Sequence, residues 1–343
     1  MGKRTTAAKV TVAGLAACLC VTAARAETCT TQSAMTAAER NSLAEAARSL
    51  ALKVQSDDLT GLRGALTPEL AKDAAAFEYL VGNTSTKLAG GPPVVEEIYT
   101  LDATNLKKNP DGSAPDAQFF CSLNNTTAEV QFTIPALPPG KYGFAIVTFA
   151  PASGKPWRLS FLLRQDAGRW LMAGFYPSAM TAAGHDGLWY WTEARQMAKQ
   201  KQPWVAWLYY QQAERLLTPA AFVMSTHLDK LHTEAAGAAP PVLAEGISAD
   251  TPLVVKAADG TEYRFTGLGV DDSLGQASVD VAAHMKADAI SDPVAARKRN
   301  DAAAAALVAA YPELRKPFHG VWIYAETAGQ PPFATEQPMA DLK

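Results

Sequence analysis

Alternating large apolar residues between Lys155 and Ala182 constrain the fold more than any other feature of the chain. Every second residue is apolar over 157–163, and the same holds over 170–176. The polar segment Gln165–Gly168 separates the two runs. Such alternation is typical of half-buried β-strands, and a short connection with Asp and Gly is typical of a hairpin turn. The sequence therefore predicts a β-hairpin over 157–176.

Three helices are expected before this hairpin. A capping box at residues 36–39 precedes apolar side chains at helical spacing over 37–55. A second, short helix can begin at Asp57 and Asp58, and Pro68 is well placed to open a third.

Four more strand-like runs lie between the helices and the hairpin, at residues 94–101, 119–123, 129–134 and 142–149. Helices followed by a run of antiparallel strands indicate an α+β fold. We expect a single curved antiparallel sheet that wraps over the leading helices and leaves an open cavity.

This order of elements resembles the NTF2-like family, whose domains fold a curved sheet and a long N-terminal helix into a cone with a pocket. The segment Gly168–Tyr176 is similar to the closing strand of that family, with a turn glycine, a tryptophan and alternating apolar residues. The resemblance covers about residues 37–180 and implies a pocket, but the acid–base set of the family's enzymes has no residue-by-residue match here. A β-sandwich over 94–178 is the alternative fold, and the preceding helices favour the cone.

From Gly187 the apolar periodicity becomes helical, and two helices are expected, separated by Pro203 and followed by Pro219. A third helix is expected over 222–236. The pair resembles one tetratricopeptide repeat. The residues that carry this resemblance are Ala194, Ala206, Tyr210 and Ala213.

The predicted helical pair holds seven large aromatic rings within residues 189–210. Two helices cannot bury so many rings against each other, so we expect most of them to pack on the neighbouring sheet, with a binding groove as the alternative. The candidate ligand-binding residues are Trp189, Trp191, Trp204, Trp207, Tyr210, His185 and Asp186.

A small C-terminal α+β domain is expected after a linker at residues 236–241. Its helix begins at Asp292–Pro293 and extends to about Ala310, and the proline-containing tail after Gly329 is expected to be irregular. The expected strands of this domain are 253–257, 261–266, 279–285 and 318–325.

The first 26 residues have the pattern of a secretory signal peptide. A basic start precedes an apolar run at 10–23, and small residues at Ala24–Ala26 allow cleavage. The alternative is a lipobox at Leu15–Cys18, which would leave a lipid anchor on Cys18. No later stretch is long enough to span a membrane. The expected parts are a signal peptide (1–26), an NTF2-like domain (27–182), a tetratricopeptide-like helical segment (183–238) and the C-terminal domain (239–343).

Removal of the signal changes both the charge and the cysteine content. It takes away four cations and no anions, which moves the formal net charge from −3 to −7 and makes nucleic-acid binding unexpected. It leaves Cys29 and Cys121, for which we predict a disulfide in a periplasmic or secreted protein. The alternative is that both thiols stay free.

The sequence contains no recognisable signature of a catalytic site, a metal site or a cofactor site. His227 and His232 are five residues apart, whereas two ligands of one metal on a helix are four apart. His284 and His319 fall in predicted strands without an evident acidic or cysteine partner.

Glu96 and Glu97 adjoin in a predicted strand, so that their side chains are expected on opposite faces. They therefore cannot act as a pair on one substrate. One of them could face a pocket, while the ordinary expectation is that one faces solvent and the other pairs with Arg158 or Arg164.

These observations predict an exported, non-catalytic binding or scaffold protein. Its ligand, a protein, a peptide or a small apolar molecule, would occupy the cone or the aromatic helices. The alternative is an enzyme of the NTF2-like type, a hydrolase, dehydratase or isomerase. An enzyme pocket should bring two titratable groups within hydrogen-bond reach in one cavity, whereas a binding site should be mainly apolar.

Overall fold

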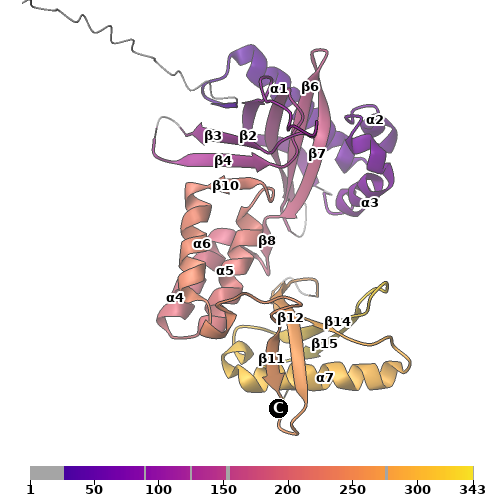
Figure 1. Ribbon diagram of the computed structural model, residues 1–343, viewed down its shortest axis with the longest axis vertical. Helices are drawn as coiled ribbons and strands as arrows, with labels where there is room; N and C mark the ends of the chain where they lie inside the picture. Colours follow the sequence, from indigo (N-terminus) through magenta and orange to yellow (C-terminus); the bar gives the residue numbers. More distant parts are fainter. Residues whose placement is uncertain (1–26, 89, 124–125, 152–154, 275–276, 343) are drawn as a thin grey trace, which may run out of the picture.

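The computed structural model describes residues 27–88, 90–123, 126–151, 155–274 and 277–342. They form a mixed α+β protein in which an N-terminal α+β part, a group of three helices and a C-terminal α+β part follow one another along the long axis (Figure 1). The expected signal peptide, residues 1–26, and the lipobox at Cys18 lie outside the described residues. Within the described ranges, no helix is both long and apolar enough to cross a membrane.

Helix α1, Ala37–Gln55, begins at the predicted capping box. The Oγ1 atom of Thr36 accepts a hydrogen bond from the backbone N–H of Glu39 (3.3 Å), and the Glu39 carboxylate accepts one from the backbone N–H of Thr36 (3.3 Å). Because both unpaired amides are satisfied locally, this helix start was predictable from four residues.

The two helices that follow are short. Helix α2, Leu59–Arg63, begins after Asp58, as predicted. The third helix begins later than Pro68, because a 3₁₀ turn, Leu70–Asp73, precedes α3, Ala74–Ser85.

A five-stranded antiparallel sheet with the order β1-β2-β5-β6-β7 forms the centre of the N-terminal part. Its strands are β1 (Thr28–Thr31), β2 (Gly90–Asp102), β5 (Lys141–Pro151), β6 (Trp157–Asp166) and β7 (Arg169–Ala179). The predicted hairpin is confirmed as β6 and β7, in which Asp166 pairs with Arg169. The two turn residues, Ala167 and Gly168, both have positive φ, as a tight hairpin turn requires.

The expectation of a single sheet is wrong. Strands β3 (Ala117–Ser122) and β4 (Glu129–Ile134) form a separate sheet with β10 (Val223–Ser225), in the order β10-β4-β3. The prolines of the segment 135–139 separate β4 from β5 and interrupt the run of backbone donors that pairing would need. Strand β5 pairs with β2 instead, and β4 gains β10 as its second neighbour.

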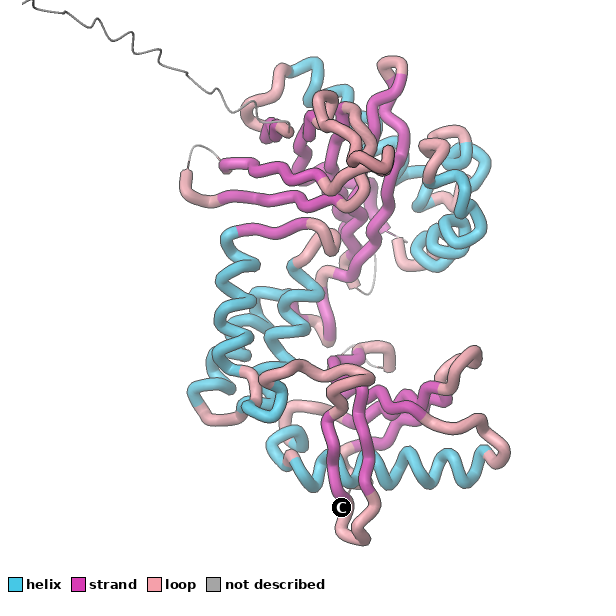
Figure 2. Tube along the Cα trace, in the orientation of Figure 1, coloured by secondary structure: helices cyan, strands magenta, loops and turns pink. Residues whose placement is uncertain are grey.

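The two faces of the five-stranded sheet have different covers. Ala145 and Val147 of β5 belong to the cluster that contains the side chains of α1 to α3, whereas Phe144 belongs to the cluster shared with β3 and β4. The leading helices therefore close one face, and the small sheet lies over the other (Figures 1 and 2).

The predicted disulfide between Cys29 and Cys121 is confirmed, and it joins β1 of the large sheet to β3 of the small sheet. The two Cα atoms are 5.3 Å apart, and 92 positions separate the cysteines in the sequence. On the entropic model, closing a loop of this length stabilises the folded state by about 4 kcal/mol.

The predicted helices of the central segment are present. Helix α4 spans Gly187–Lys199, α5 spans Pro203–Leu217 and begins at the predicted proline, and α6 spans Thr226–Ala238. The third helix starts later than predicted because β10 takes the residues before it. A small hairpin, β8 (Thr181–Ala182) with β9 (His185–Asp186), precedes α4, and a 3₁₀ turn, Pro241–Leu243, lies at the end of the predicted linker.

The C-terminal part is a five-stranded sheet with the order β11-β12-β13-β14-β15. Its elements are β11 (Leu253–Lys256), β12 (Glu262–Asp271), β13 (Asp280–Lys286), α7 (Pro293–Ala310), a 3₁₀ turn (Pro312–Arg315), β14 (Gly320–Glu326) and β15 (Phe333–Pro338). Strands β13 and β14 are parallel and α7 connects them, while the other pairs are antiparallel.

The expectation of an irregular tail is wrong because β15 forms there. Two prolines, residues 331 and 332, precede this strand, and Pro338 ends it. None of the three interrupts the middle of the hydrogen-bonded ladder, and β15 is an edge strand, where proline is tolerated.

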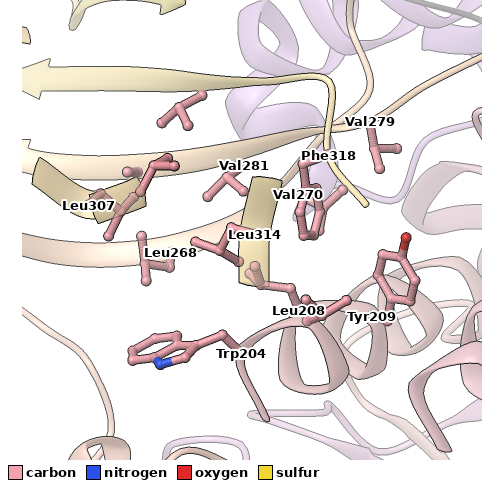
Figure 3. Packing of buried hydrophobic residues seen from close by; sticks show 14 of the residues in the cluster. Trp204, Leu208, Tyr209, Leu268, Val270, Val279, Val281, Leu307, Leu314 and Phe318 are labelled. Carbon is pink, nitrogen blue, oxygen red and sulfur yellow. The ribbon is translucent and has the colours of Figure 1, made fainter. Parts of the chain in front are cut away.

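One hydrophobic cluster spans the central helices and the C-terminal sheet. Trp204 and Tyr209 of α5 face this sheet (Figure 3). The Trp204 ring lies 4.1 Å from that of Tyr311, and the Tyr209 ring lies 5.7 Å from that of Phe318. Some of the large aromatic rings of the central helices are therefore buried against the C-terminal part, rather than against the N-terminal sheet.

The carboxyl end of α5 is held by a buried arginine from the N-terminal sheet. Arg158 of β6 is 8% exposed, and its guanidinium donates hydrogen bonds to the backbone carbonyls of Leu216 (3.3 Å), Leu217 (3.5 Å) and Thr218 (2.8 Å). Burial lowers the pKa of Arg158 to about 10. These bonds satisfy carbonyls that the last helical turn leaves unpaired.

The amino end of α5 is held from the other side. The backbone N–H of Trp204 donates a hydrogen bond of 2.8 Å to the carboxylate of Glu313, which belongs to the C-terminal part. Burial raises the pKa of Glu313, and the hydrogen bond from Trp204 opposes this rise. A carboxylate at the amino end and a guanidinium at the carboxyl end both complement the helix dipole.

We expect Arg158→Met to lower the free energy of unfolding by about 2–4 kcal/mol, because the carbonyls at the end of α5 lose their donors while they stay buried. Urea unfolding followed by circular dichroism measures this loss. Arg169→Met is the matched control, since Arg169 is exposed on the neighbouring strand, and it should change stability by less than about 0.5 kcal/mol. Equal losses in the two variants would contradict the role given to Arg158.

Tyr209 makes stability depend on pH in the alkaline range. Burial raises the pKa of Tyr209 to about 12, whereas an unfolded tyrosine has a pKa of about 10. A raised folded-state pKa gives stability that is complete below the unfolded pKa and is lost as the pH rises towards the folded one.

We therefore expect the unfolding free energy of the wild type, relative to Tyr209→Phe, to fall by about 2 kcal/mol between about pH 10 and pH 12. Urea unfolding at several pH values in this window provides the measurement. Tyr79→Phe is the control, because Tyr79 is 76% exposed. A pH-independent difference between wild type and Tyr209→Phe would show that the phenol does not contribute in this way.

Candidate functional site

A cavity of about 490 Å³ lies between the two N-terminal sheets and the central helices. Ten of its fourteen lining residues are apolar. The lining residues come from β2, β4, β5 and β10, from the start of α4, from the end of α5 and the residues after it, and from the start of α6. They are Glu97, Tyr99, Val130, Phe132, Phe144, Ile146, Leu188, Trp191, Leu217, Pro219, Val223, Ser225, His227 and Leu228. The cavity is therefore on the face of the large sheet opposite the leading helices, where the sequence did not predict it.

Aromatic rings in the sheet walls of the cavity pack on one another. Phe132 of β4 meets Phe144 of β5 edge to face at 5.1 Å, and it meets Tyr99 of β2 at 5.3 Å. Such pairs contribute about 0.5–1.5 kcal/mol beyond the burial of their surface. The space left beside these rings is preformed.

The helix wall centres on Trp191 of α4. Its indole N–H donates to the Glu234 carboxylate (2.8 Å), and the Arg195 guanidinium lies over its ring at 4.6 Å. Arg195 also binds Glu234 through two hydrogen bonds of 2.6 and 2.9 Å. Leu188, one helical turn earlier, is 59% exposed, which makes it the part of this wall most open to solvent.

The polar end of the cavity is a pair of side chains from β2. The phenol O–H of the buried Tyr99 donates a hydrogen bond to the exposed Glu97 carboxylate. Burial, and then the hydrogen bond to Glu97, raise the pKa of Tyr99, so the phenol stays neutral and donating at physiological pH. This end of the cavity can therefore accept a hydrogen bond or a positive charge at the carboxylate.

A β-bulge places Glu97 at the cavity. The register of β2 against β5 shifts between Val95 and Glu97. Glu96 accepts a hydrogen bond of 2.7 Å from Thr148 on the neighbouring strand. The expectation that one glutamate pairs with Arg158 or Arg164 is wrong, because Arg158 caps α5 and Arg164 binds Glu69 (3.0 Å).

Of the seven candidate ligand residues, the structure places only Trp191 in this lining. His185 stacks on Trp189 at 3.7 Å, and Asp186 caps α4 by accepting the backbone N–H of Trp189 (2.8 Å). Trp204 and Trp207 meet edge to face at 6.1 Å near the C-terminal sheet, and Tyr210 lines a separate groove with Arg195.

Three of the five histidines have acidic neighbours that the sequence did not reveal. His232 lies 2.8 Å from Glu214, and the Nδ1 atom of His284 lies 2.8 Å from Glu326. His319 lies 3.1 Å from Asp280. The expectation that His284 and His319 lack acidic partners is therefore wrong, because β13, β14 and the unpredicted β15 bring distant residues together.

Sequence reasoning missed Tyr99 and the lining residues of β10. The alternation of β2 alone could have placed Tyr99 on one face, but not which layer covers that face. Val223 and Ser225 were expected in a helix, and three residues are too few for a strand pattern.

No family model, no curated protein and no solved structure matches the chain.

Proposed function

We propose that this chain is an exported binding protein that holds a small, mainly apolar ligand in the cavity between its two N-terminal sheets. The observation that carries the proposal is the composition of the lining, ten apolar residues with polar groups gathered at Glu97 and Tyr99 and at the start of α6. The volume of the cavity, about 490 Å³, falls within the usual range for small-molecule sites, about 300–1,000 Å³.

The polar groups favour a ligand with a donor or a cation at one end. Glu97 is the only lining residue with a formal charge at neutral pH when histidine is neutral. Its carboxylate attracts an ammonium group, accepts a hydrogen bond from a hydroxyl group and repels another carboxylate. An amphiphile with an amine or hydroxyl head and an apolar body therefore fits best.

We also propose that residues 27–182 are an NTF2-like unit and that α4 with α5 is a tetratricopeptide-like pair. Three helices that pack on one face of an antiparallel sheet support the first assignment. Two adjacent helices with small, fully buried residues, Ala194 of α4 and Ala206 of α5, support the second.

The alternative is an enzyme of the same architecture, a hydrolase, dehydratase or isomerase. The hydrogen-bonded pair of Glu97 and Tyr99 favours it, because two titratable groups then share one cavity. A general acid works best when its pKa is near the operating pH, and the pKa of Tyr99 is raised away from that range. Binding without chemistry is therefore the better-supported use of the site.

We expect the neutral, fluorescent N-phenyl-1-naphthylamine to bind with one-to-one saturation. Ile146→Trp, which adds a ring inside the cavity, should weaken this binding at least about tenfold, which corresponds to about 1.4 kcal/mol. Val254→Trp on β11 is the matched control and should bind like the wild type, because Val254 is 43% exposed in the other α+β part. Equal binding by Ile146→Trp and wild type would place the probe elsewhere and refute the proposal.

Competition with three amphiphiles of equal chain length tests the polar end. Decylamine should displace the probe best, decanol less well and decanoate least, because only the amine gains charge attraction to Glu97. The order should flatten in Glu97→Gln. If decanoate competes as well as decylamine in the wild type, the carboxylate does not select the ligand.

Export is tested by the intact mass of the protein isolated from the producing cell. The disulfide between Cys29 and Cys121 supports an oxidising compartment. We expect the mass of residues 27–343 less two hydrogens, as cleavage after Ala26 and one disulfide require. A mass that begins at Cys18 with added acyl chains would assign a lipid anchor instead, and a full-length, reduced chain would contradict export.

A further inference from the structure

Three side chains that bind metals well meet at one end of the C-terminal sheet, far along the chain from the ligand cavity. They are Asp280, the first residue of β13, His319, which directly precedes β14, and Glu336 of β15. Strands β13 and β14 are parallel, so their amino ends lie side by side, and the antiparallel β15 passes beside β14. Strand register alone brings the three residues together.

The donor atoms have the spacing of a metal site. The Nδ1 atom of His319 is 3.1 Å from the Oδ1 atom of Asp280 and 3.9 Å from the Oε1 atom of Glu336, and one donor atom from each residue falls within 4.8 Å of the others. Ligands at bond lengths of about 2.0–2.2 Å in a tetrahedral site are roughly 3.3–3.6 Å apart. Small side-chain rotations would suffice to reach that geometry.

One of the two carboxylates is buried and the other is half-buried, with one oxygen that lacks a partner in the described part of the chain. The Asp280 side chain is 5% exposed and the Glu336 side chain 18%. The Oε1 atom of Glu336 is inaccessible to solvent and has no hydrogen-bond partner among the described residues. A buried carboxylate oxygen without a partner is unusual in folded proteins, and a second carboxylate beside it increases the need for positive charge.

A glycine keeps the space between the two carboxylates open. A Cβ atom at Gly320 would lie 2.5 Å from the Oε1 atom of Glu336 and 3.2 Å from the Oδ1 atom of Asp280. A side chain at this position would therefore occupy space next to both oxygens. The site is open to solvent on the side of His319, whose side chain is 49% exposed.

We propose that Asp280, His319 and Glu336 bind one divalent transition-metal ion, with zinc the best match. Imidazole nitrogen together with carboxylate oxygen suits zinc and its neighbours in the first transition row, whereas magnesium and calcium prefer oxygen ligands alone. Three protein ligands leave one position for water, as in zinc sites that act on or exchange a fourth ligand.

Isothermal titration of the metal-stripped full chain with zinc chloride tests the proposal. We expect one zinc ion per chain, and we expect Glu336→Gln and His319→Ala each to weaken binding by about 100-fold or more, since each removes a direct ligand. His284→Ala is the matched control. His284 also lies beside a carboxylate on the same sheet, that of Glu326 at 2.8 Å, and this substitution should leave the affinity unchanged.

Two further measurements distinguish metal binding from a metal-free ion pair between His319 and the neighbouring carboxylates. Cobalt added in place of zinc should give the visible absorption of a low-symmetry, four-coordinate site in the wild type and lose it in Glu336→Gln. Thermal unfolding without metal should show Glu336→Gln to be as stable as the wild type or more so, because it removes one of two neighbouring carboxylates. Absence of stoichiometric zinc binding, or binding that survives in both ligand variants, would overturn the proposal.

Discussion

Unpaired backbone groups at the two ends of α5 determine how the parts of this protein are joined. The carbonyls at its carboxyl end are satisfied by Arg158 from the N-terminal sheet, and the amide of Trp204 at its amino end by Glu313 from the C-terminal part. Each cap removes a buried polar group that would otherwise destabilise the fold, and each places the matching charge at the matching pole of the helix. Helix α5 is thus attached at its carboxyl end to the N-terminal sheet and at its amino end to the C-terminal part.

The ligand cavity follows from this attachment. Because Arg158 holds the end of α5 against β6, the chain that leaves α5 runs past the large sheet and enters β10 beside β4. Strand β10 and α6 then form walls that the two sheets alone lack. The disulfide between Cys29 and Cys121 ties the two sheets together. The cavity therefore lies between layers that different segments of the chain supply.

Local features were predictable, and features that depend on the order of strands were not. The hairpin of β6 and β7, the capping box of α1 and the proline at the start of α5 each depend on a few neighbouring residues, and the disulfide depended on having only two cysteines left. The prolines that end β4 are visible in the sequence, but the partner that β4 takes instead, β10, lies about ninety residues away. The caps of α5 come from 58 to 109 positions away and Asp280 lies 39 positions from His319, so no periodicity in the sequence indicates these pairs.

Helix α5 joins the two parts of the protein that carry the proposed sites, and its length separates these parts. Leu217, at the carboxyl end of α5, lines the ligand cavity, whereas Trp204 and Tyr209 pack on the C-terminal part that carries Asp280 and His319. A helix of fifteen residues spans about 22 Å and transmits a displacement only if it moves as a whole. Arg158 and Glu313 oppose such movement from both ends. Because coupling between sites requires an element with two arrangements, and α5 is held in one, the cavity and the triad are expected to bind their ligands independently.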